Sequence, residues 1–248
     1  MSNAVHQHTA GEKPKHEVAH IFELYGPAFQ KAHSLPLSHL KVMQHIRVCR
    51  TAKLGGHVDR CDSCDFEQNS YNSCRDRHCP KCQCLATERW LEARKEELLP
   101  VGYYHTVFTL PHELNPLVLT NKEVCFGLLF KAVNETLQGF ALDKRWKLGG
   151  QLGLIGVLHT WDQKLLDHFH LHCLIPAGVL TENKKWHHAK DNFLFPVQAL
   201  AKVFRAKFMT GLKQAYQENK LIFPGKTKEF ASKTNSCKPH PIWSHIPQ

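Results

Sequence analysis

The chain has 248 residues, 42% of them hydrophobic, and a formal net charge of +10 with its 19 histidines counted as neutral. This length accommodates one large domain or two small ones, and no apolar run reaches the roughly 20 residues of a membrane-spanning helix. Residues 1–15 are polar and lack the apolar stretch of a signal peptide, so we expect a disordered lead-in and a cytoplasmic protein. The positive charge predicts a polyanionic partner, of which nucleic acid is the commonest.

The first half of the chain predicts a small helical domain over residues 16–99. Between residues 16 and 50, apolar side chains recur at helical spacing, which predicts two amphipathic helices. The pair Gly55-Gly56 and a cysteine-rich segment follow, and we expect this part to be rich in loops and held by metal. A charged helix over about 85–99 closes the domain, because Pro100 cannot continue it.

The cysteine-rich segment predicts structural zinc. Two pairs of cysteines are spaced Cys-x-x-Cys, and this spacing lets one tight turn aim both sulfurs at one metal, so that two such turns complete a tetrahedron. Disulfides are the weaker interpretation for a protein in a reducing compartment. The predicted zinc ligands are Cys61, Cys64, Cys79 and Cys82.

Further cysteines and histidines leave the number of zinc ions open. An alternative second set consists of Cys49, His57, Cys74 and His78, and either Cys74 or His78 could instead replace a member of the first set. Basic side chains crowd the same segment and suit contacts with phosphate, although a solvated basic loop is an equal interpretation. The candidate DNA-binding residues are Arg75, Arg77 and Lys81.

The second half predicts an α+β domain over residues 100–223, followed by an unstructured tail over 224–248. β-branched and aromatic runs indicate strands, and apolar residues at helical spacing indicate helices. The predicted elements are a strand over 103–110, a helix over 121–140, a hairpin of strands over 152–160 and 168–175, a short strand over 186–189 and a helix over 197–217. This order is typical of a mainly antiparallel sheet flanked by helices.

A histidine cluster in the predicted hairpin is the strongest functional signal. His168, His170 and His172 alternate along one strand, so their side chains share one face of the sheet. His159 lies near the end of the preceding strand and can face the same site across the hairpin. Imidazoles grouped on a sheet surface predict a divalent-metal site with open coordination positions, which would accept phosphate oxygens.

Several motifs together resemble one family. The chain resembles the HUH-type two-tyrosine transposases of insertion sequences, the IS ninety-one group, which carry an N-terminal transposase zinc-binding domain. The resemblance covers roughly residues 21–223. Its landmarks are Cys49-Arg50-Thr51-Ala52, the run from Tyr71 to Gln83, the run from Val107 to Pro116, His159-Thr160-Trp161, the run from His168 to Leu174 and the run from Phe193 to Val197.

The resemblance implies metal-assisted chemistry on single-stranded DNA at transposon ends. In such a family His170 and His172 would hold magnesium or manganese beside an HUH-endonuclease-like sheet. His159 is the favoured third ligand, and His168 and Gln163 are alternatives. A tyrosine hydroxyl would then attack the scissile phosphate and form a phosphotyrosine link. The expected location of such a protein is the cytoplasm, in association with the nucleoid.

The chain departs from the family in its tyrosines. The family places a Tyr-x-x-x-Tyr pair after the metal hairpin, whereas only Tyr216 follows it here, and we do not expect Tyr216 to be a nucleophile. The expectation is therefore a truncated and inactive copy. The main alternative is a zinc-dependent DNA-binding protein that recognises transposon ends without cutting. A hydrolase that uses water is a further alternative, with Asp162 and Asp167 as its nearest carboxylates.

Overall fold

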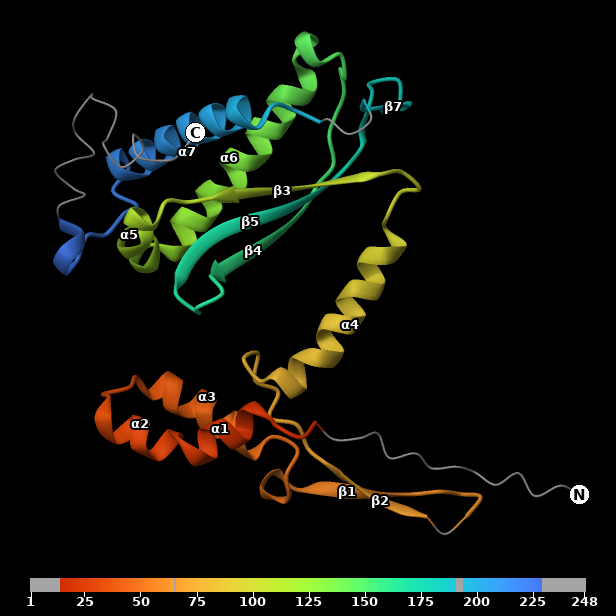
Figure 1. Cartoon of the computed structure of the whole chain (residues 1–248), viewed down its shortest axis with the longest axis vertical. Coiled ribbons are helices and arrows are strands. Elements are labelled where there is room, and N and C mark those ends of the chain that lie inside the picture. The colour runs from red at the N-terminus through yellow and green to blue at the C-terminus, as the bar shows by residue number, and fades with distance from the viewer. Residues whose placement is uncertain (1–13, 65, 191–193, 229–248) are drawn as a thin grey trace, which may run out of the picture. The chain divides into compact units, whose positions relative to one another are not determined.

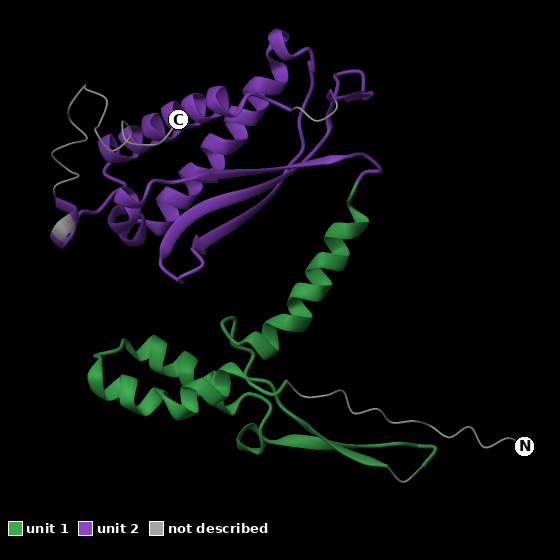
Figure 2. Ribbon diagram, in the orientation of Figure 1, with its two compact units in different colours: residues 1–98 green, residues 99–248 purple. Residues whose placement is uncertain are grey.

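The computed structural model describes residues 14–64, 66–190 and 194–228, and these form two compact units, Met1–Leu98 and Leu99–Gln248 (Figure 2). The predicted lead-in lies outside the described residues except at its last two positions. Most of the predicted tail lies outside them as well. Among the described residues, no helix combines the length and the apolar character required to cross a membrane.

Unit 1 begins with three short helices in place of the two that the sequence predicted: α1 (Val18–Leu24), α2 (Gly26–Ala32) and α3 (Leu37–Val48) (Figure 1). The two-helix prediction was wrong because Pro27 lacks a backbone N–H. Proline is tolerated in the first turn of a helix, so the chain starts a new helix there.

A β-hairpin follows in the segment that the sequence predicted to be rich in loops. Its strands are β1 (Gly56–Arg60) and β2 (Glu67–Tyr71), which pair antiparallel after a short turn of 3₁₀-helix over Ala52–Leu54. Nearly every residue of both strands is exposed. Because neither face is buried, the alternation of apolar and polar residues that identifies a strand is missing from the sequence.

The helix α4 (Pro80–Glu96) begins five residues earlier than the predicted start at Leu85. Pro80 lies in its first turn, and Cys79 caps it. Cys79 and Cys82 therefore lie at the start of a helix and not in a loop.

Unit 2 contains a three-stranded antiparallel sheet in the order β3–β5–β4. The strands are β3 (Tyr103–Thr109), β4 (Ile155–Trp161) and β5 (Asp167–Pro176). The predicted short strand is β7 (Trp186–His188), and it pairs with β6 (Gly178–Leu180), which was not predicted. The helices are α5 (Asn115–Thr120), α6 (Lys122–Leu142) and α7 (Val197–Gln217). The predicted α+β class is confirmed.

The helices α6 and α7 lie together on one side of the sheet (Figure 1). The contacts are aromatic: the rings of Phe108 and Phe204 are 5.1 Å apart, and those of Phe126 and Phe169 are 5.6 Å apart. Phe208 of α7 and Leu171 of β5 are almost wholly buried in the same core. One face of the sheet is thus apolar and covered, which leaves the opposite face to carry polar side chains.

Candidate metal centres

Four cysteines of unit 1 converge on one point. The ligand atoms of Cys49, Cys74, Cys79 and Cys82 all lie within 4.8 Å of one another. Cys49 follows α3, Cys74 follows the hairpin, and Cys79 and Cys82 lie at the start of α4. Cys49 and Cys79 are fully buried and Cys74 and Cys82 are half-buried.

Backbone hydrogen bonds at the base of the hairpin bring together Cys49 and Cys74, which are far apart in the sequence. The N–H of Arg50 donates to the carbonyl of Asn72, and the N–H of Asn72 donates to the carbonyl of Gly55. These bonds place Cys49 beside Cys74, whose N–H points at the Cys49 sulfur at 3.5 Å.

The geometry fits zinc. Sulfurs about 2.3 Å from a tetrahedral zinc lie about 3.8 Å from one another. The Cys49 and Cys82 sulfurs are 3.5 Å apart and the Cys74 and Cys82 sulfurs are 3.6 Å apart. Four thiol groups at these separations, with one Cys-x-x-Cys turn among them, form a tetrathiolate set.

The pKa values of these thiols show why a cation belongs there. Burial raises the pKa of Cys74 and of Cys49. Burial also acts to raise the pKa of Cys82, but hydrogen bonds from Cys49, Cys74 and Cys79 outweigh it and lower the pKa to about 7. Zinc binds thiolates, so a bound zinc would favour the ionised form of all four side chains.

An acidic side chain supports the turn between Cys74 and Cys79. The Asp76 carboxylate accepts hydrogen bonds from the His78 backbone N–H at 2.8 Å and from the His45 ring at 2.8 Å. The bond from the His78 N–H has the larger effect on the Asp76 pKa and the bond from His45 the next, and the pKa is lowered to about 2. The Asp76 carbonyl accepts from the Cys79 N–H at 3.1 Å, so this residue links α3, the turn and the start of α4.

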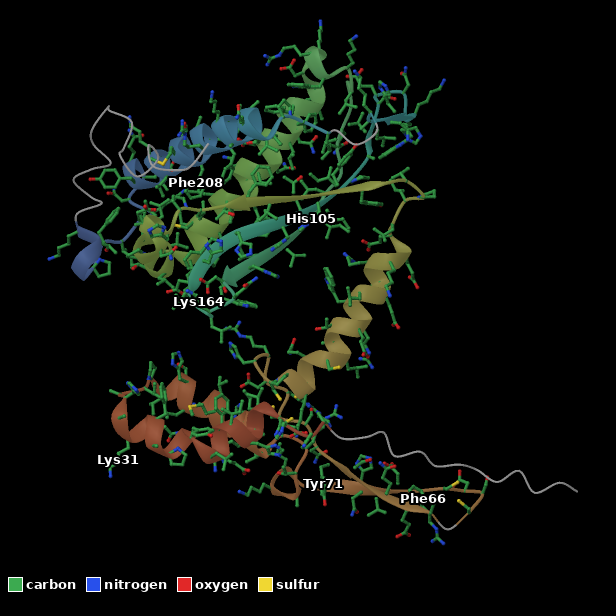
Figure 3. The ribbon with its side chains drawn as sticks, viewed as in Figure 1. Lys31, Phe66, Tyr71, His105, Lys164 and Phe208 are labelled. Atoms are coloured by element: carbon green, nitrogen blue, oxygen red, sulfur yellow. The ribbon has the colours of Figure 1, made fainter. Side chains whose placement is uncertain are left out.

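The predicted grouping of zinc ligands therefore needs correction. Cys61 and Cys64 do not join Cys79 and Cys82, because they lie at the far end of the hairpin, where the Cys61 N–H donates to the Phe66 carbonyl. Figure 3 shows Phe66 toward the tip of this hairpin and Tyr71 at its base. Five residues of strand extend about 16 Å. Equal spacing of two cysteine pairs could not reveal that a hairpin separates them.

The alternative second set of zinc ligands, Cys49, His57, Cys74 and His78, does not form a site of its own among the described residues. Its two cysteines, Cys49 and Cys74, complete the first site, and its two histidines are outside the cysteine cluster. His57 lies 3.4 Å from Asp59 on β1, and His78 bonds to Asp76.

The three basic residues proposed for DNA contacts differ in their surroundings. Arg75 and Arg77 are exposed, and Arg75 has a left-handed backbone with φ of 54° at the turn that carries Cys74. The Lys81 ammonium instead lies 2.6 Å from the Glu17 carboxylate and 3.5 Å from the Cys49 carbonyl. This ion pair ties α4 to the start of α1, which is a structural role.

The second cluster lies on the face of the sheet in unit 2 that is opposite to α6 and α7, where His170 is buried and His159 and His172 are half-buried. His159 on β4 is the Cα partner of His170 on β5, and His172 lies two residues further along β5 on the same face. The ligand atoms of these three histidines all lie within 4.8 Å of one another. The neighbouring Phe169, Leu171 and Cys173 point into the core, as the sequence pattern predicted.

Hydrogen bonds orient two of these rings. The His170 Nδ1 lies 3.0 Å from the His168 carbonyl oxygen, which can only accept, so Nδ1 carries the hydrogen and Nε2 presents its lone pair. The His172 Nδ1 lies 2.8 Å from Nε2 of His105 on β3. Burial, and then the proximity of His159, His170 and His105, lowers the His172 pKa, which favours the neutral imidazole that a metal requires.

The alternatives for a third ligand are less well placed. His168 is not part of the three-histidine group, although its ring lies 4.8 Å from that of His170. Gln163 is exposed in the turn between β4 and β5. In the same turn the Asp162 carboxylate accepts from the backbone N–H groups of Lys164 and Leu166, so it shapes the turn rather than the site.

Sequence reasoning missed His105 as part of this site. His105, Val107 and Thr109 alternate along β3 and share one face, and Thr109 and Val107 pair with His170 and His172. Only the register between β3 and β5 shows that this histidine reaches the cluster.

Tyr216 lies in the helical layer of unit 2. It packs with the core at the end of α7, and its ring is 5.7 Å from that of Phe223. The same end of α7 buries Leu212 and Ala215 in the core between the helices and the sheet, whereas the three histidines occupy the other sheet face.

Two family models match the chain. Residues 21–110 match the model described as "Transposase zinc-binding domain", and residues 153–243 match the one described as "Putative transposase".

Two curated relatives are similar over much of the chain. A "Putative transposase y4qJ" of Sinorhizobium fredii is 47% identical over 84% of this chain and 52% of its own length. The "Transposase for insertion sequence element IS801" of Pseudomonas savastanoi pv. phaseolicola is 32% identical over 61% of this chain and 35% of its own length. The chain thus spans about half or less of the length of these relatives.

Among solved structures, a conjugative relaxase, TrwC, in a metal-bound complex with oriT DNA is similar over 52% of this chain and 53% of that chain. The TM-score is 0.34 and the identity is 16%, which is too remote to carry an argument. The two family models and the two transposases agree with one another and with the cysteine cluster. Together these matches support an insertion-sequence transposase of the IS ninety-one type, with a transposase zinc-binding domain over residues 21–110.

Proposed function

We propose that this chain binds single-stranded DNA at transposon ends and holds the scissile phosphate at the cluster of His159, His170 and His172. The observation that carries the proposal is this cluster: three imidazoles whose ligand atoms lie within 4.8 Å of one another on one sheet face, in a chain that matches a transposase family model. The protein would act on DNA in the cytoplasm.

The donor set fits magnesium or manganese with open positions. His170 presents Nε2, burial lowers the His172 pKa and so favours its neutral form, and His159 faces both rings at centroid distances of 5.2 and 4.5 Å. A divalent ion held there would polarise a phosphate oxygen. The three side chains fix the site on two rigid strands, which limits where a phosphate could lie.

The surroundings suit an unpaired strand. Trp161 is 51% exposed and its ring stacks on that of His159 at 5.4 Å, so aromatic surface adjoins the histidines. Unpaired bases stack on such surfaces irrespective of sequence. The net charge of +10, with Arg75 and Arg77 exposed beside the zinc cluster, would attract the backbone.

Strand cleavage by a tyrosine is the activity that family membership points to, and among the described residues after the histidine hairpin only Tyr216 could supply the hydroxyl. Tyr216 is the one tyrosine after the histidine hairpin, and it packs in the helical layer. This favours a second candidate function for these residues, the recognition of transposon ends without cutting.

One experiment tests both candidates. The full chain is incubated with labelled single strands and duplexes of transposon-end sequence and with manganese, and then analysed for binding and for denaturation-resistant adducts. We expect tighter binding of single strands and no adduct. Equal affinity for duplex would refute the strand preference. An adduct that disappears in Tyr216→Phe would refute the non-cutting function and make Tyr216 the nucleophile.

A further inference from the structure

We propose that His105 is a positioning residue: it accepts a hydrogen bond from the Nδ1–H group of His172 and thereby directs Nε2 of His172 to a divalent metal. This inference rests on the function proposed above and adds a residue that no sequence motif marks.

The sheet register places His105 within reach. Val107 on β3 is the Cα partner of His172 on β5, and His105 lies two residues before Val107 on the same face. Such diagonal neighbours are within reach of long side chains. The His105 Nε2 lies 2.8 Å from the His172 Nδ1, and the two rings are nearly parallel, with 7° between their planes and 5.0 Å between their centroids.

The chemistry of imidazole gives this contact its consequence. A neutral ring has one N–H and one lone pair, and a metal takes the lone pair. For His170 the carbonyl of His168 settles which nitrogen is which, because a carbonyl only accepts. For His172 the partner is another imidazole, which can donate or accept.

Only one of these arrangements serves a metal through Nε2. If His105 accepts, His172 carries its hydrogen on Nδ1 and presents the Nε2 lone pair, as His170 does. If His105 donates, the hydrogen of a neutral His172 moves to Nε2 and occupies the metal-binding position. The orientation of this bond therefore decides whether the cluster has three ligands or two. Partners of this kind change metal affinity by about 10- to 100-fold.

The test compares two substitutions in the full chain with a matched control. His105→Gln keeps an acceptor, because its amide oxygen can reach the position of Nε2. His105→Phe keeps an aromatic ring at this position and removes the acceptor. His112→Ala is the control, since His112 is 80% exposed and lies outside the cluster. Manganese affinity is measured by electron paramagnetic resonance, and the His172 tautomer is measured by ¹⁵N NMR in metal-free protein.

We expect His172 to carry its hydrogen on Nδ1 in the parent and in His105→Gln. The manganese affinity of His105→Gln and of His112→Ala should be close to that of the parent. The affinity of His105→Phe should be about 10- to 100-fold lower. Parent affinity in a folded His105→Phe, or the hydrogen on Nε2 in the parent, would overturn the inference. If the parent binds no manganese, the proposed function fails, and the tautomer in the parent alone decides the role of His105.

Discussion

Replacing Cys74 by serine separates the zinc set that the structure shows from the set that sequence spacing predicted. The cluster of Cys49, Cys74, Cys79 and Cys82 includes Cys74, whereas the set predicted from spacing has Cys61 and Cys64 in place of Cys49 and Cys74. We expect Cys74→Ser to lose zinc and to unfold unit 1. We expect Cys61→Ser, a change at the exposed end of the hairpin, to keep the zinc.

The expected magnitude follows from how little apolar surface unit 1 buries. Apart from two cysteines, its buried hydrophobic residues among those described are Ala19, Ile46 and Val48. A fully buried Ile or Val side chain contributes about 1.5–3 kcal/mol, so these residues together contribute roughly 5 kcal/mol. Structural zinc contributes about 10–16 kcal/mol in small domains, so the metal stabilises unit 1 more than its apolar core does. Losing it should therefore remove the fold of unit 1, with unit 2 retained.

The assay combines zinc content by mass spectrometry with limited proteolysis and circular dichroism of protein purified without added metal. The parent and Cys61→Ser should contain equal zinc, and Cys74→Ser should show rapid cleavage confined to residues before Leu99. Full zinc in Cys74→Ser, or loss of zinc in Cys61→Ser, would refute the assignment of the ligands.

Three further outcomes are expected. Asp76→Ala should weaken zinc binding about tenfold at pH 7 in a chelator competition, because it releases the turn held by His45 and His78; unchanged competition would contradict this. The pKa of His172 is lower in the folded than in the unfolded chain, so as the pH falls the unfolded chain is protonated at this residue before the folded chain is. Metal-free unit 2 should therefore lose stability as the pH falls below about 6.5. In thermal melts, His172→Gln should show a weaker dependence of stability on pH. Phe208→Ala should destabilise unit 2 by about 3–5 kcal/mol in urea unfolding, since this ring is 1% exposed, and a loss below about 1 kcal/mol would argue against the described core.

The sequence by itself determined the features that depend on local periodicity. Alternation along β5 placed His170 and His172 on one face and Phe169 and Leu171 on the other, and helical spacing located α7. Cysteine content predicted zinc, and the motifs predicted the family. These properties are visible in sequence because the side-chain period of a strand or helix is fixed by its backbone.

Tertiary structure decided which distant residues meet. The pairing of Arg50 with Asn72 brings Cys49 to Cys74, and the exposed hairpin carries Cys61 away, although its spacing to Cys64 is that of a zinc turn. The register of β3 against β5 brings His105 to His172. Spacing along the chain does not encode these meetings, because strand pairing and register are set by packing and backbone hydrogen bonds between segments far apart in sequence.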